Sequence, residues 1–161
     1  MKNKIIYTIL FLVTILLCKA QTVSDYIAFY NGVVPKLNNV AIYKTQFYGQ
    51  NFSNFYTELQ SKNINITMLF CDYKTDPGSK YYILKLFFCD GNMLRVASQN
   101  SFIYPRVIIT FENEIPKQVD DMIQQNHAQW SPTFAQFFAN MKIEKIDFIG
   151  VKGYNVDDFS E

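Results

Sequence analysis

The feature that most constrains the fold is a central run of short strands that are apolar on both faces. Residues 64–73 and 80–89 predict a β-hairpin, because two runs rich in Ile, Leu, Phe and Tyr flank the turn sequence 76–79 (Asp-Pro-Gly-Ser). Opposed residues in this hairpin have numbers that sum to about 155, so Cys71 is expected to face Leu84. An antiparallel sheet with one wet face normally alternates apolar and polar residues, and this hairpin does not.

Two further strands extend the apolar pattern. The Asp90-Gly91 pair predicts a tight turn into a strand over 93–98, and residues 105–112 alternate like another strand. One face is expected to hold Ile64, Ile66, Met68, Phe70, Ile83, Phe87, Leu94 and Val96. The other is expected to hold Leu69, Cys71, Tyr82, Leu84, Leu86, Phe88 and Met93, with Thr67 and Arg95. Each buried large side chain is worth roughly 1.5–3 kcal/mol, so the second face needs a cover. More helix, a curved sheet around a pocket, or a partner subunit would each provide one.

Helical patterns and two more strands flank this centre. Short helices are predicted from Ser24 or Asp25 to Tyr30, with Gly32 as the stop, and over 53–62, 116–126 and from Ser131-Pro132 onward. Strands are predicted over 40–48 and 145–151. Clustered strands joined by short turns favour an α+β domain. We expect a curved, mainly antiparallel sheet of about five to six strands with helices packed against it.

The N-terminus has the layout of a secretory signal. Lys2 and Lys4 precede an apolar run from Ile5 to Cys18, and Ala20 offers a small residue at the cleavage point. The run is shorter than the roughly 20 residues that span a membrane, so no stable anchor is expected after cleavage. Lipidation at Cys18 and an uncleaved anchor are the alternatives. The predicted organisation is a signal peptide over 1–20, one α+β domain over 21–152 and a flexible acidic tail over 153–161.

Composition excludes several classes of partner. Loss of the leader with Lys2, Lys4 and Lys19 leaves twelve basic and fourteen acidic residues, without a basic block. Electrostatic binding to nucleic acid or to an anionic membrane is therefore not expected. The sequence lacks a phosphate-binding glycine loop and metal-ligand spacing, so no cofactor and no metal are predicted.

Only Cys71 and Cys89 remain in the mature chain, and the hairpin register keeps them apart. Cys89 would oppose Ile66, several residues along the ladder from Cys71 and on the opposite face. A disulfide needs Cα atoms within about 7 Å, so two buried, unpaired thiols are predicted.

Catalytic signals are weak. His127 is the only histidine, at the end of a predicted helix, where a surface role at the helix terminus is common. No nucleophile elbow accompanies it, and Asp90 beside Cys89 would raise the pKa of that thiol. A small hydrolase-like extracytoplasmic enzyme that uses His127 or a carboxylate is the alternative function.

The leading hypothesis is a secreted or periplasmic binding or interaction module without catalytic chemistry. Its second sheet face would line a pocket for a small apolar or amphipathic ligand, or pair with a second copy of the chain. Arg95 and Arg106, the only arginines, could grip a ligand carboxylate or form structural ion pairs with Glu112 or Asp72. The candidate ligand-binding residues are Tyr82, Leu84, Leu86, Phe88, Met93, Arg95 and Arg106.

Overall fold

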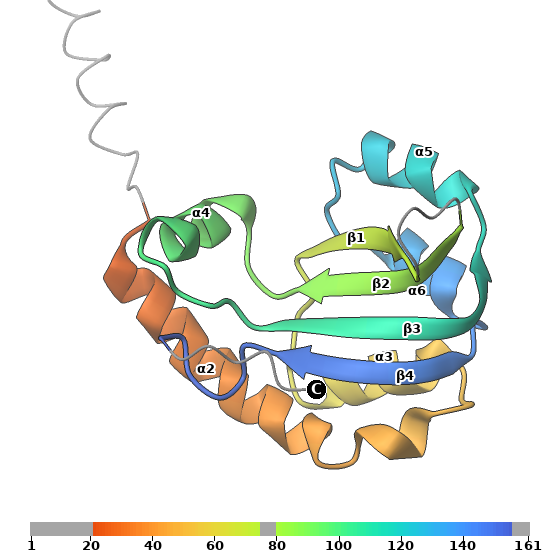
Figure 1. The fold of residues 1–161 in the computed structure, drawn as a ribbon, viewed down its shortest axis with the longest axis horizontal. Helices are drawn as coiled ribbons and strands as arrows, with labels where there is room; N and C mark the ends of the chain where they lie inside the picture. Colours follow the sequence, from red (N-terminus) through yellow and green to blue (C-terminus); the bar gives the residue numbers. More distant parts are fainter. Residues whose placement is uncertain (1–20, 75–79, 156–161) are drawn as a thin grey trace, which may run out of the picture.

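A four-stranded antiparallel sheet organises the chain, with helices packed against one of its faces (Figure 1). The computed structural model describes residues 21–74 and 80–155. The elements in chain order are α2 (Val23–Ala41), the 3₁₀ helix η1 (Lys44–Phe47), α3 (Phe52–Ser61), β1 (Met68–Tyr73), β2 (Tyr81–Phe87), α4 (Gly91–Gln99), β3 (Arg106–Ile115), α5 (Gln118–Gln125), α6 (Pro132–Phe138) and β4 (Ile143–Ile149).

The α+β class and the antiparallel sheet are confirmed, but the expected five to six strands are not. The described strands form one open sheet in the order β1-β2-β3-β4. The predicted hairpin is present in the predicted register, with Cys71 opposite Leu84. The leader 1–20, the whole predicted turn at 76–79 and tail residues 156–161 lie outside the described residues.

The strand predicted over 40–48 is wrong, as is the helix stop at Gly32. Helix α2 runs through Gly32 and Pro35 to Ala41, and η1 follows. Glycine in a helix costs about 1 kcal/mol and proline about 3 kcal/mol. Burial of a long apolar stripe outweighs both, because each large side chain contributes roughly 1.5–3 kcal/mol. The buried stripe of α2 consists of Tyr26, Tyr30, Val34, Leu37 and Val40.

The strand predicted over 93–98 is also wrong, because Asp90 begins a helix instead of a turn. Its carboxylate accepts a hydrogen bond from the Met93 backbone N–H at 2.9 Å, which caps α4. Asp followed by Gly is compatible with both a hairpin turn and a helix N-terminus. Helix α4 packs against α2 beyond the ends of the strands (Figure 1).

An aromatic core joins the helices to the sheet. Phe52 on α3 contacts Phe111 on β3 and Phe138 on α6, and the rings of Phe111 and Phe138 stack with centroids 5.8 Å apart. All three side chains are fully buried. The predicted helix after Ser131-Pro132 therefore presents its apolar face to the sheet as expected.

Helix α2 is held to the ends of β3 and β4 by hydrogen bonds from tyrosines. Tyr30 Oη donates to the Gly150 carbonyl at 2.8 Å, and Tyr26 Oη donates to the Ile103 carbonyl. The Tyr26 ring stacks on Phe102 and meets Tyr154 edge-on. This cluster of rings closes the end of the domain that the sheet does not reach.

Candidate functional site

The sequence-predicted site residues are divided between the core and the surface. Leu84 and Leu86 are fully buried, on the sheet face that packs against the helices. Helix is therefore the cover that the apolar second face required, at least for this part of the sheet. A ligand pocket against these residues stays a prediction. Phe88 and Met93 are also buried, outside the strands, whereas Tyr82 is half-buried beneath the Lys74 ammonium group.

The two arginines lie on different elements of the structure. Arg95 is exposed on α4, where its guanidinium donates to the Asn92 side chain at 3.4 Å. Arg106 lies on β3, and its guanidinium carbon sits 5.2 Å from the centre of the Tyr104 ring. The Asp72 carboxylate, an expected ion-pair partner, bonds to Lys85 instead.

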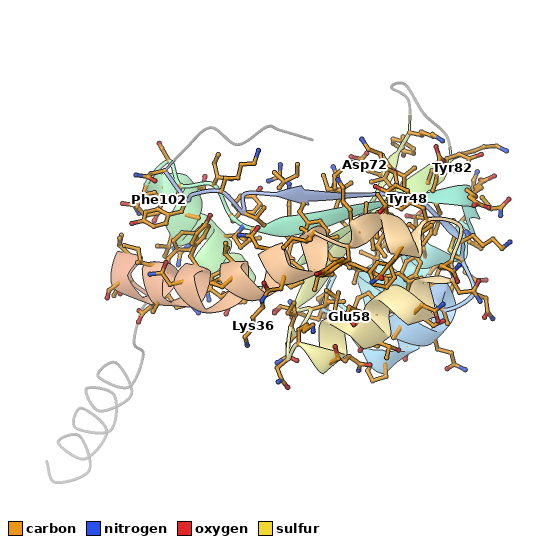
Figure 2. All side chains as sticks on the ribbon, turned by 90° about the horizontal axis from the view of Figure 1, so that it is seen from below. Lys36, Tyr48, Glu58, Asp72, Tyr82 and Phe102 are labelled. Carbon is orange, nitrogen blue, oxygen red and sulfur yellow. The ribbon has the colours of Figure 1, made fainter. Side chains whose placement is uncertain are left out.

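The most distinctive surface is the sheet face opposite the helices, which we name the open face. Figure 2 views the sheet along its edge, with α2, α3 and α6 on one side, and none of the described elements lies over the other side. The register of the strands fixes its members in three rows that cross from β1 to β4. These rows are Met68-Phe87-Arg106-Ile149, Phe70-Lys85-Ile108-Asp147 and Asp72-Ile83-Thr110-Lys145.

Six of the twelve open-face side chains are apolar, which is high for a sheet surface in water. Phe70 is 42% exposed, and its ring meets Phe87 edge-on with centroids 5.6 Å apart. Tyr104 also packs against Phe87, with ring centroids 5.9 Å apart, and continues this aromatic group towards Arg106. The rings shield one another, so Phe87 is buried although no described helix covers it.

On β1 and β2, charge on the open face is held by an ion pair between Asp72 and Lys85. The hydrogen bond from Lys85 lowers the pKa of the Asp72 carboxyl below its ordinary value, and the Tyr73 backbone N–H assists. Both side chains remain partly exposed, so the pair is a weak contributor to stability. The same groups are available to a partner that brings its own charges.

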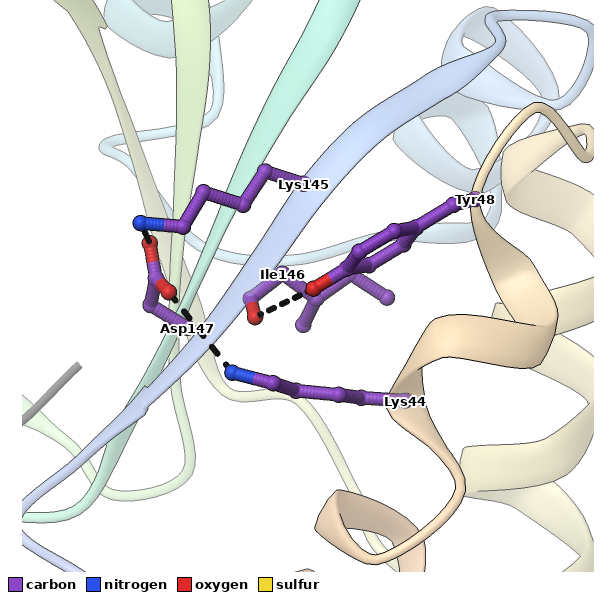
Figure 3. Close-up of polar contacts among 5 residues, drawn as sticks. All are labelled: Lys44, Tyr48, Lys145, Ile146 and Asp147. Atoms are coloured by element: carbon purple, nitrogen blue, oxygen red, sulfur yellow. Dashed lines mark hydrogen bonds and ion pairs between the residues drawn. The ribbon is translucent and has the colours of Figure 1, made fainter.

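A second charge cluster lies on β4. The Asp147 carboxylate pairs with Lys145 at 3.3 Å, and Lys44 of η1 lies 3.8 Å away (Figure 3). Tyr48 anchors the segment after η1 by donating from Oη to the Ile146 carbonyl at 3.5 Å. Charges along an outer strand discourage unwanted strand pairing at the sheet edge. The open face thus carries both signs of charge in each half, with Asp72 and Lys85 on β1 and β2 and with Asp147 and Lys145 on β4.

The catalytic candidates lie apart. His127 is exposed in the turn after α5, where its backbone adopts a left-handed conformation with φ of 51°. Burial raises the pKa of the Cys89 thiol to about 12, and the Asp90 charge adds to this effect. Burial likewise raises the pKa of Cys71 to about 12. Both cysteines are free thiols, as predicted, and neither has the lowered pKa of a nucleophile.

The described ranges 21–74 and 80–155 contain no group of three or more His, Cys, Asp or Glu side chains placed to hold a metal ion. Over the same ranges, no helix combines the length and apolarity needed to cross a membrane. Comparison of the chain with protein-family models, with curated proteins and with solved structures gave no match.

The sequence grouped the hairpin residues on two faces correctly and predicted a cover for both faces, whereas no described helix covers the face of Phe70 and Lys85. Met68, Phe70, Ile83 and Phe87 were placed together, as they are in the structure. Lys85 was the available signal, because a lysine in the middle of a strand marks the face that reaches water. Asp72, which pairs with Lys85, and Asp147, two strands away in the same row as Lys85, lie on the same face.

Proposed function

We propose that the mature chain is a secreted or periplasmic, non-catalytic interaction module that self-associates through its open face. The observation that carries this proposal is the combination of six apolar side chains with charges of both signs on a sheet surface free of described helices. The extracytoplasmic address rests on the N-terminal sequence pattern alone.

A second copy of the chain is the occupant that the charges favour. A face with one dominant sign would fit a partner of the opposite sign, whereas this face holds acidic and basic groups on both sides of its centre. Such a surface can be complementary to itself when two copies are related by a twofold axis. Apolar residues between the charges supply the contact area that loses water.

The size of the face limits the expected affinity. Four strands about 4.8 Å apart, with about 3.3 Å per residue over five residues, outline a patch of roughly 20 Å by 17 Å. This outline is smaller than the roughly 800 Å² per partner of a standard interface. We therefore expect a dimer with a dissociation constant in the tens of micromolar, about −6 kcal/mol.

Sedimentation equilibrium of the mature chain across this concentration range tests the proposal. The wild-type protein is expected to pass from monomer to dimer, and Phe70→Glu is expected to remain a monomer. Ile42→Glu is the matched control, because Ile42 is 70% exposed but lies between α2 and η1, outside the open face. Circular dichroism of each variant checks that the fold is intact.

A wild-type protein that stays monomeric far above these concentrations would overturn the proposal. Equal loss of association in Ile42→Glu and Phe70→Glu would do the same, because the contact would then not be specific to the open face. Native mass spectrometry of the same samples detects a co-purifying small ligand, which would favour the pocket hypothesis instead. The N-terminal sequence of the exported protein reports whether the leader is removed after Ala20.

A further inference from the structure

We infer that the two copies stack with their twofold axis parallel to the strands, so that β1 of one copy lies over β4 of the other. This inference rests on the proposed self-association and adds its geometry. Two sheets that pack face to face normally keep their strands within about 30° of each other. A twofold axis in the plane of contact then has two simple directions, along the strands or across them.

The register decides between these directions. With the axis along the strands, β1 of one copy lies over β4 of the other, and β2 lies over β3. Each row then lies over the same row of the second copy. Asp72 of one copy then faces Lys145 of the second, and this contact occurs twice. Lys85 faces Ile108 of the second copy and has the Asp147 position of that copy one strand away. Charges of opposite sign therefore meet directly in the Asp72 row, and in the middle row Asp147 of the second copy faces Phe70, beside Lys85.

An axis across the strands gives the opposite result. Each strand then lies over the same strand of the second copy, and the order of the rows is reversed. The middle rows of the two copies therefore face each other. Lys85 then faces Lys85, and Asp147 faces Asp147. Like charges placed opposite each other cost several kcal/mol at an interface, which excludes this arrangement for so weak a contact.

The remaining row supports the same choice. With the axis along the strands, Phe87 faces Arg106 of the second copy, and Met68 faces Ile149. Arg106 already lies over the Tyr104 ring of its own chain, so its guanidinium would lie between two aromatic groups. A guanidinium on an aromatic face is a favourable contact that tolerates partial burial.

Cross-linking between variants that each carry one added cysteine tests this geometry. Asp72→Cys and Lys145→Cys proteins are mixed and treated with a short bis-maleimide near neutral pH, and each variant is also treated alone. The expected result is a covalent dimer from the mixture and none from either variant alone, since residues 72 of the two copies would be separated by the width of three strand spacings. Of the native thiols, Cys89 is buried and Cys71 is half-buried, and the wild-type chain measures their background reaction.

Cross-linking of the Phe70→Cys variant alone tests the other axis, which runs across the strands. Residue 70 lies in the middle row on β1, so two copies of it meet only when the axis runs across the strands. Because this substitution alters the contact itself, it is cross-linked at a concentration where sedimentation still shows dimer. A cross-link through residue 70, or a dimer that shows no 72-to-145 cross-link, overturns the inferred axis. Absence of any wild-type dimer overturns the proposed function instead, so the two failures are distinguishable.

Discussion

Three glycines in this chain give a controlled test of how backbone conformation and close packing contribute to stability. Gly150 follows β4 with φ of 73°, and Gly49 precedes α3 with φ of 72°. A Cβ at Gly150 would lie 2.6 Å from the Tyr104 carbonyl oxygen, whereas at Gly49 the nearest group is a Glu112 side-chain oxygen at 3.9 Å. The two positions therefore share the backbone strain and differ in the clash.

The expected magnitudes follow from these contacts. A left-handed conformation costs a non-glycine residue about 1–2 kcal/mol, and this is the whole expected cost of Gly49→Ala. In Gly150→Ala the backbone of Tyr104 has to move as well, and overpacking of this kind costs about 1–3 kcal/mol. The shift also strains the hydrogen bond from Tyr30 to the Gly150 carbonyl. We expect Gly150→Ala to lose about 2–5 kcal/mol in total.

Urea denaturation of both variants beside the wild type measures these differences. Gly32→Ala in the middle of α2 is a control that should raise the free energy of unfolding instead of lowering it, because nothing lies within 4 Å of the added methyl group. Alanine is favoured over glycine inside a helix, so this variant should gain about 0.5–1 kcal/mol. If Gly150→Ala and Gly49→Ala lose the same free energy, the close approach of Tyr104 does not contribute and the reasoning is wrong.

Four further outcomes are expected. Cys71 and Cys89 should resist a thiol reagent at pH 8 in the folded protein and react in urea, because burial raises the pKa of each thiol to about 12. The pKa of each thiol is higher in the folded chain than in the unfolded chain, where it is near 8.5, so its contribution to stability is fully present below about pH 8.5. The free energy of unfolding should therefore fall as pH rises from about 8.5 towards 12, and an increase would contradict this. The Asp72 carboxyl should titrate below 3.8 by NMR and move upward in Lys85→Met, since Lys85 holds its pKa down; its small contribution is present at neutral pH and is lost as pH falls through the folded pKa. Phe138→Ala should cost about 3–5 kcal/mol in urea denaturation, and a loss below about 1 kcal/mol would show that the stacked core is not tightly packed.

Some local features were visible in the sequence because a few adjacent residues decide them. The hairpin register followed from the positions of two apolar runs, and it is found with Cys71 opposite Leu84. The start of α6 followed from Ser131-Pro132, since proline at the first helical turn loses no hydrogen bond. These features require no knowledge of what packs against them.

Other features depended on competition that local patterns do not resolve. Gly32 and Pro35 disfavour a helix, yet the apolar spacing of Tyr26, Tyr30 and Leu37 continues across them and the packed face prevails. The sequence already showed this periodicity, but the sequence-based prediction gave more weight to the turn residues and therefore ended the helix too early. Asp90-Gly91 fits a turn and a helix cap equally, so only the surroundings of Met93 select the helix.

The sequence by itself determined the class of the domain, the pairing of β1 with β2 and the grouping of the residues of these two strands on each sheet face, because these depend on spacing along one chain. Only the tertiary structure decided which face the helices cover. Leu84 and Ile83 are neighbours with similar side chains that lie on opposite faces of the sheet. Phe138 packs on the face of Leu84 because the segments after β3 return to that face. The reason is physical: burial rewards any apolar face, and the path of the connections selects the one that is buried.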